Sequence, residues 1–202
     1  RVVLGGEGAW LGVITTGKSW YDLVAALDDL GIDDARARAL GMRVYKVGMT
    51  WPLEPVGIRE FAVGLDDIIV VEEKRSFIES QMKEHMYNWP EFDQGRHARP
   101  SIVGKYDEAG NWILPSTGEL TPATIAIVIA RRLARFFTSD AIESRMRWIV
   151  RGGGAARADL VRVLLQVGVV ECIEPATGEL VPEQPRKRVM ERVKQVERGP
   201  RT

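Results

Sequence analysis

The chain has 202 residues, 45% of them hydrophobic and 28% charged, so its size and composition suit one globular domain with an appendage. Its 28 basic residues match its 28 acidic ones in number, which argues against recognition of nucleic acid or an acidic membrane through overall charge. The single cysteine excludes an internal disulfide framework and favours a cytoplasmic setting, and no apolar run reaches the roughly 18–20 residues that cross a bilayer.

Residues 1–10 are rich in glycine and are predicted to form a linker, and the first residue, Arg1, favours an internal piece of a longer protein. An apolar run typical of a buried strand follows and ends at the turn residues Thr15–Gly17. Ser19 is a suitable N-cap for a helix that ends before Gly31. The apolar face of this helix is predicted to consist of Leu23, Val24, Leu27 and Leu30.

Strands and helices alternate through the middle of the chain. The pattern predicts a polar helix at 34–40, a strand at 42–47, a short helix from Pro55 to about Gly64, and an apolar strand at 68–71. A helix is then predicted from Arg75, with a loop at 88–99. Its buried stripe is expected to consist of Phe77, Ile78, Met82 and Met86.

A further strand is predicted at 100–105, a turn at 107–111 and a hairpin partner at 112–114. A long apolar helix begins with Thr121 as N-cap and Pro122 as its first residue. The side chains expected to point inward are Ile125, Val128, Ile129 and Leu133. Strands that alternate with helices in this way predict an α/β fold with a mostly parallel sheet and helices on both faces.

The character of the chain changes at Gly152–Gly154. Before this break acidic residues are in slight excess, and after it basic residues are. We therefore expect a domain over 11–150 and an irregular C-terminal tail of unclear identity over 151–202, partly disordered. The basic run at 186–188 has neighbouring glutamates, which favours a solvated tail over a nucleic-acid arm.

Residues 12–19 match the G-x-x-x-x-G-K-S phosphate-loop pattern through Gly12, Gly17, Lys18 and Ser19. That chemistry needs a loop of free backbone amides between the two glycines. Here Val13 and Ile14 belong to the predicted strand, which favours an ordinary strand–turn–helix junction. An acidic residue after an apolar strand, Glu72, resembles the residue that would hold magnesium, so a nucleotide hydrolase stays as an alternative.

Glu72, Glu73 and Lys74 follow an apolar strand at the end where open α/β sheets bind ligands. A solvated strand-to-helix turn is the favoured alternative for them. Trp51, Trp89 and Trp112 fall in loops or at sheet edges, where an interface and core packing are equally plausible.

The two histidines, His85 and His97, are twelve positions apart with no cysteine or paired acids at ligand spacing, which argues against a metal site. We expect His85 to be packed or at the surface. Cys172 is expected to be a buried thiol without a chemical role. No nucleophile–base pair and no dinucleotide fingerprint is present in the sequence.

Three runs of sequence resemble indolepyruvate ferredoxin oxidoreductase, a thiamine-diphosphate-dependent 2-oxoacid:ferredoxin oxidoreductase. They begin TTGKSWYDLV, RVYKVGMTWPLEP and RPSIVGKYDEAGNWILPSTGEL, and together cover about Leu11 to Leu133. The most specific matches are at 46–48, 51–53, 71–74 and 118–120. The resemblance is to the middle domain, similar to the transketolase C-terminal domain, and implies a three-layer α/β/α fold with a largely parallel sheet of about five strands.

The resemblance also implies that the chemistry of the parent enzyme lies in other domains. Such enzymes convert aryl 2-oxoacids to acyl-CoA with thiamine diphosphate, magnesium and iron–sulfur clusters, and pass electrons to ferredoxin. One cysteine cannot ligate a cluster that needs about four. This chain is therefore expected to be inactive alone, with no catalytic residue, cofactor or metal of its own.

The leading hypothesis is a scaffold that contacts the flanking domains or subunits of the parent enzyme, with a homodimer as a further option. The candidate interface residues are Thr16, Lys18, Trp51, Glu72, Glu73 and Lys74. The alternatives are the phosphate-loop hydrolase and a free-standing protein-interaction module.

Overall fold

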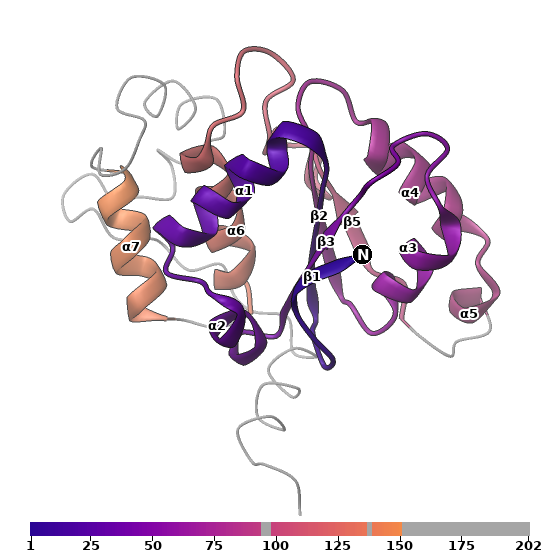
Figure 1. Cartoon of the computed structure of the whole chain (residues 1–202), viewed down its shortest axis with the longest axis horizontal. Helices are drawn as coiled ribbons and strands as arrows, with labels where there is room; N and C mark the ends of the chain where they lie inside the picture. The colour runs from indigo at the N-terminus through magenta and orange to yellow at the C-terminus, as the bar shows by residue number, and fades with distance from the viewer. Residues whose placement is uncertain (94–97, 137–138, 151–202) are drawn as a thin grey trace, which may run out of the picture.

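A computed structural model describes residues 1–93, 98–136 and 139–150 (Figure 1). Within these ranges the chain forms one five-stranded sheet in the order β1-β3-β2-β4-β5. The strands are β1 (Val2–Gly5), β2 (Leu11–Thr15), β3 (Met42–Lys46), β4 (Asp67–Val71) and β5 (Ser101–Val103). Only β1 among them is antiparallel to its neighbour, so the predicted mostly parallel sheet is confirmed.

Seven helices connect or flank the strands in the described residues. They are α1 (Gly17–Asp29), α2 (Asp34–Ala39), α3 (Pro55–Ala62), α4 (Phe77–Tyr87), α5 (Pro90–Asp93), α6 (Pro122–Ala134) and α7 (Asp140–Val150). In Figure 1, α1, α2, α6 and α7 lie on one side of the sheet and α3, α4 and α5 on the other. The predicted three-layer α/β/α arrangement is therefore confirmed.

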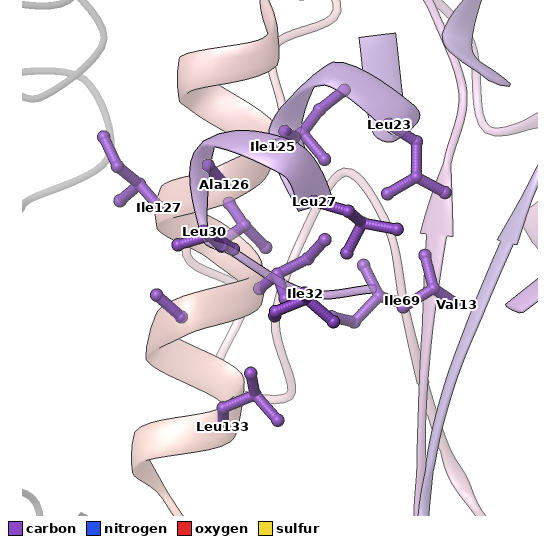
Figure 2. Packing of buried hydrophobic residues seen from close by; sticks show 14 of the residues in the cluster. Val13, Leu23, Leu27, Leu30, Ile32, Ile69, Ile125, Ala126, Ile127 and Leu133 are labelled. Carbon is purple, nitrogen blue, oxygen red and sulfur yellow. The ribbon is translucent and has the colours of Figure 1, made fainter. Parts of the chain in front are cut away.

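The central strands β2 and β4 are buried along their whole length, because helices cover both faces of the sheet. On one face, Val13 and Ile69 pack against Leu23 and Leu27 of α1 and Ile125 of α6 (Figure 2). On the other face, β2 and β4 pack against α3 and α4. Those contacts are made by Ile14, Ile68 and Val70 with Ile58, Phe61, Ile78 and Met82.

Caps fix where several helices begin. Thr121 accepts a hydrogen bond from the amide of Thr124, and Pro122 opens α6, as predicted. Glu54 caps α3 by accepting from the amides of Val56 and Gly57, both at 2.7 Å. The four side chains predicted to point inward from α6 are all buried.

Three expectations for the first half of the chain are wrong. Residues 1–10 are more than a linker, because β1 pairs with β3. Ser19 lies buried inside α1, and the N-cap is Thr16, three residues earlier. Val24 is 44% exposed, because the buried face of α1 runs through Leu23, Ala26 and Leu27 and Val24 lies to one side of it.

Further differences lie in the second half. Phe77 is 48% exposed, since α4 begins there and its buried stripe starts one residue later. The predicted loop at 88–99 contains the short helix α5, and the hairpin is reduced to a single bridge between Tyr106 and Trp112. Helix α7 was not predicted.

The tail at 151–202, with Cys172, lies outside the described residues, as does His97. Within the described part, no helix is long and apolar enough to cross a membrane.

Candidate functional site at the carboxyl edge of the sheet

The carboxyl ends of β2, β3, β4 and β5 meet at one edge of the sheet, because these strands are parallel. The chain leaves β2 for α1 on one face and leaves the adjacent β4 for α4 on the opposite face. Open α/β sheets bind ligands at such a switch point. All six candidate interface residues lie in or beside the loops of this edge.

The phosphate-loop pattern does not form a loop. Gly12 is paired with Arg43 of β3 and Ile68 of β4, and pairing on both sides continues to Thr15. A Cβ atom at Gly12 would lie 2.5 Å from a Leu65 methyl group and 2.8 Å from the Phe61 ring. This glycine therefore serves close packing against α3, and the strand–turn–helix prediction is confirmed.

Lys18 points outward from the first turn of α1. Its ammonium lies 2.9 Å from a carboxylate oxygen of Asp22 and 3.1 Å from one of Glu119, and its side chain is 49% exposed. These hydrogen bonds raise the pKa of Lys18. The hydroxyl of Thr16 donates to the carbonyl of Val47 at 3.3 Å. Lys18 and Thr16 thus both bind groups of this chain.

Glu72 is buried, which corrects the expectation of a solvated turn. Its carboxylate accepts the amide N–H groups of Ile78 at 2.8 Å and Glu79 at 3.1 Å, so it caps α4. Burial raises the pKa of Glu72, and the hydrogen bonds from the α4 amides oppose that rise. Glu73 is half-buried, whereas Lys74 is exposed and has a positive φ of 37°.

Lys105 also lies at this edge. It is the last residue of the strand predicted at 100–105, and the sequence gives it no functional role. It is 2% exposed, and its ammonium donates to the carbonyl oxygens of Glu72 and Pro115. Burial lowers the pKa of Lys105, while the surrounding carboxylates raise it. The signal in the sequence is limited to a lysine two positions after the apolar Ile102-Val103 pair.

The loop between β5 and α6 is therefore fastened to both sides of the switch point. Lys105 fastens it to the end of β4, and Glu119 fastens it to Lys18 at the start of α1. Leu114 and Leu120 anchor the same loop in the core. In Figure 1 the loop rises above the carboxyl ends of the strands, beside the start of α1.

Beside this loop the edge is hollowed by a groove of about 640 Å³. Trp51 lines it and is 66% exposed, with its ring centroid 5.6 Å from that of Phe77. Of the other two tryptophans in question, Trp89 is partly buried and Trp112 is 39% exposed, packed edge-on against Tyr106. The sequence left surface and core equally plausible for the three tryptophans. In the structure Trp51 is exposed, Trp89 packs against the core, and Trp112 is partly exposed.

His85, which the sequence predicts to be packed or at the surface, is half-buried on α4, with Nε2 3.1 Å from the carbonyl oxygen of Leu53. This confirms a packed histidine. Within the described ranges, no three histidine, cysteine or acidic side chains are grouped closely enough to hold a metal ion.

A family model described as the indolepyruvate oxidoreductase domain matches residues 1–156, which is more than half of the chain. A search of curated proteins found no match.

Proposed function

The chain belongs to the indolepyruvate oxidoreductase domain family, and on that basis we propose that it is the non-catalytic middle domain of an indolepyruvate ferredoxin oxidoreductase. The parent enzyme would oxidatively decarboxylate aryl 2-oxoacids to acyl-CoA and pass the electrons to ferredoxin, in the cytoplasm. Thiamine diphosphate, magnesium and iron–sulfur clusters would be held by its other domains or subunits. This chain would act as a scaffold between them, with a second copy of itself as a further possible partner.

The observation that carries this proposal is the filling of the switch point by the chain itself. In open α/β sheets a ligand enters between the loops that diverge there. Here Lys105 and Glu119 hold the β5–α6 loop across this position. Leu114 and Leu120 of the same loop are 0% and 1% exposed and anchor it in the core. A ligand could enter between the loops that follow β2 and β4 only if a loop with core contacts were displaced.

The polar groups of this edge do not fit the cofactors of the parent enzyme. A magnesium diphosphate needs carboxylate or amide oxygens that face the metal. The Glu72 carboxylate faces the α4 amides instead, and the Lys105 ammonium is bound by backbone carbonyls. One cysteine cannot supply the roughly four thiolates of an iron–sulfur cluster.

The same edge has the composition of a contact surface. Aromatic and Met side chains are enriched in protein interfaces, and four of them are well exposed here. These are Met49 at 57%, Trp51 at 66%, Phe77 at 48% and Tyr106 at 45%. Lys74 and Arg75 add exposed positive charge beside them.

Two measurements test the proposal. The full 202-residue chain, supplied with thiamine diphosphate, magnesium, coenzyme A, ferredoxin and indolepyruvate, should show no decarboxylation, and calorimetry should show no binding of thiamine diphosphate with magnesium. Mixed with the thiamine-binding remainder of the parent enzyme, it should form a complex in analytical ultracentrifugation. Turnover by the chain alone would overturn the proposal, as would failure to associate.

A further inference from the structure

The groove at the carboxyl edge has exposed aromatic rings in its lining. Trp51, Phe77 and Tyr106 are 66%, 48% and 45% exposed, and the ring centroids of Trp51 and Phe77 lie 5.6 Å apart. Grooves lined by aromatic side chains commonly bind proline-rich segments, because such a segment is already extended as a polyproline II helix and loses little entropy on binding. The lining therefore suits a short extended peptide that contains proline.

The charges of the groove differ between its two ends. Lys74 and Arg75 come just before α4, beside Phe77, and Glu73 offsets part of their charge. Glu84 lies two helical turns further along α4, about 10 Å from Phe77 along the helix axis. Among the described residues neither Arg75 nor Glu84 forms an ion pair, and both are exposed. The groove thus favours a segment with an acidic residue at one end and a basic residue at the other.

One segment of the chain has this pattern. Residues 182–188, in the tail outside the described residues, read Pro-Glu-Gln-Pro-Arg-Lys-Arg. In a polyproline II helix, which rises about 3.1 Å per residue with three residues per turn, the two prolines share one face about 9 Å apart, and Arg186 lies about 12 Å beyond Pro182. These lengths match the groove. The other P-x-x-P of the chain, at 52–55, is part of the fold, since Pro55 opens α3.

We propose that residues 182–188 dock in this groove of their own chain. The two prolines pack on the aromatic rings. Glu183 lies beside Arg75, and the basic Arg186 pairs with the carboxylate of Glu84. Charge sets the direction of the segment, because the reverse direction brings like charges together. The docked segment covers aromatic side chains that the scaffold role offers to other domains, so it competes with those domains for this edge.

The connection between α7 and the motif is long enough for this contact. It consists of residues 151–181. A coil of about 30 residues has a root-mean-square end-to-end distance of about 30 Å. A domain of about 150 residues has a radius of gyration of about 15 Å, so its whole surface is within reach. Because the two parts belong to one chain, the effective concentration is in the millimolar range, and an affinity of only about 100 μM gives about tenfold protection of the segment.

Crosslinking of the full chain tests which residues meet. Arg186→Lys keeps the positive charge and supplies an amine, which a zero-length carbodiimide reagent should join to the carboxylate of Glu84. An equal mixture of ¹⁵N-labelled and unlabelled protein should give this crosslink within single copies, as read by mass spectrometry. Absence of the crosslink would overturn the proposal. Crosslinks between labelled and unlabelled copies would overturn it too, because the segment of a second copy would then fill the groove.

Digestion of the full chain with trypsin tests protection. Cleavage after residues 186–188 should be about tenfold slower than cleavage after Arg198, which lies in the same tail beyond the docked segment. Trp51→Ala removes an exposed ring of the groove and should abolish the protection. Tyr87→Ala is the matched control, since this ring is 69% exposed at the far end of α4, and it should leave the protection unchanged.

Variants of the tail complete the test without any change in the folded domain. The double variant Pro182→Ala with Pro185→Ala should also lose the protection, whereas Pro175→Ala, outside the motif, should keep it. Equal cleavage rates in the unchanged chain, in Trp51→Ala and in the double variant would overturn the proposal. Neither experiment contains the parent enzyme, so its result is separate from the test of the scaffold role.

Discussion

Lys105 is joined to Glu72 across 33 positions of sequence, through a hydrogen bond from its ammonium to the backbone carbonyl oxygen of Glu72. The same ammonium donates to the carbonyl of Pro115 at 3.0 Å. One buried side chain thus ties the end of β4 to the loop that follows β5.

Lys105→Met should loosen this edge. The change keeps the apolar stem and removes the donor, so the carbonyls of Glu72 and Pro115 lose a partner. We expect the free energy of unfolding in urea to fall by about 1–3 kcal/mol. Lys74→Met removes an exposed ammonium from the same edge and should change it by no more than about 0.5 kcal/mol. Equal losses in the two variants would contradict the role assigned to Lys105.

Arg132→Met should be more damaging, because Arg132 of α6 forms a two-pronged pair with Asp67 of β4 at 2.6 Å for both contacts. Arg132 is 5% exposed and Asp67 2% exposed. Removal of the arginine leaves a buried carboxylate without its partner. We expect a loss of about 3–5 kcal/mol in the free energy of unfolding.

A second change distinguishes this effect from lost packing. The double variant Asp67→Asn with Arg132→Met no longer contains an isolated buried charge, so it should be more stable than Arg132→Met alone. Arg135→Met removes only a pair with Glu108 near the surface and should cost less than about 1 kcal/mol. A double variant less stable than the single one would contradict the interpretation.

Glu108 should make stability depend on pH. Burial by itself would raise its pKa, but hydrogen bonds from Arg132 and Ser101 hold the pKa well below its ordinary value of 4.5. The folded state therefore binds fewer protons than the unfolded state in acid. The contribution of Glu108 to stability is therefore complete above the pKa that Glu108 has in the unfolded chain, and it is lost progressively as the pH falls from there towards the lower pKa of the folded state.

The comparison of Glu108→Gln with the unchanged chain isolates this contribution. Glu72 has a pKa raised by burial, so its effect has the opposite sign, but it is present in both proteins. In urea titrations the variant should be less stable at pH 7, and the difference should shrink progressively between about pH 5 and pH 3. A difference that stays constant over this interval would contradict the assignment.

The sequence predicts those parts of the fold that depend on local pattern. The apolar runs that became β2 and β4, and the Thr121-Pro122 start of α6, are decided by neighbouring residues. Strand β1 was missed because its stability comes from pairing with β3, about forty positions away, and not from its own glycine-rich surroundings. Its sequence alone has too little apolar pattern to predict a strand.

The candidate site shows the same limit more sharply. The sequence favours a strand–turn–helix junction over a phosphate loop, because Val13 and Ile14 fit the strand, and the pairing of β2 on both sides agrees with this preference. It does not predict the burial of Glu72 or Lys105, because charged residues in a turn are usually solvated. Their burial depends on the α4 amides and on carbonyls brought together by the tertiary fold.

Gly12→Ala tests the packing at the centre of the sheet. The added methyl group would lie 2.5 Å from Leu65 and 2.8 Å from Phe61, so the side chains of the α3 layer must shift, and we expect a loss of about 1–3 kcal/mol in the free energy of unfolding. Gly48→Ala, at a position with no atom within 4 Å of the new carbon, should have little effect and serves as the control.

A phosphate loop at residues 12–19 would show calorimetric binding of ATP that Lys18→Ala abolishes. The backbone of β2 is paired on both sides, with β3 and with β4, so its amides are not free to bind phosphate. We therefore expect no ATP binding by the unchanged chain or by Lys18→Ala.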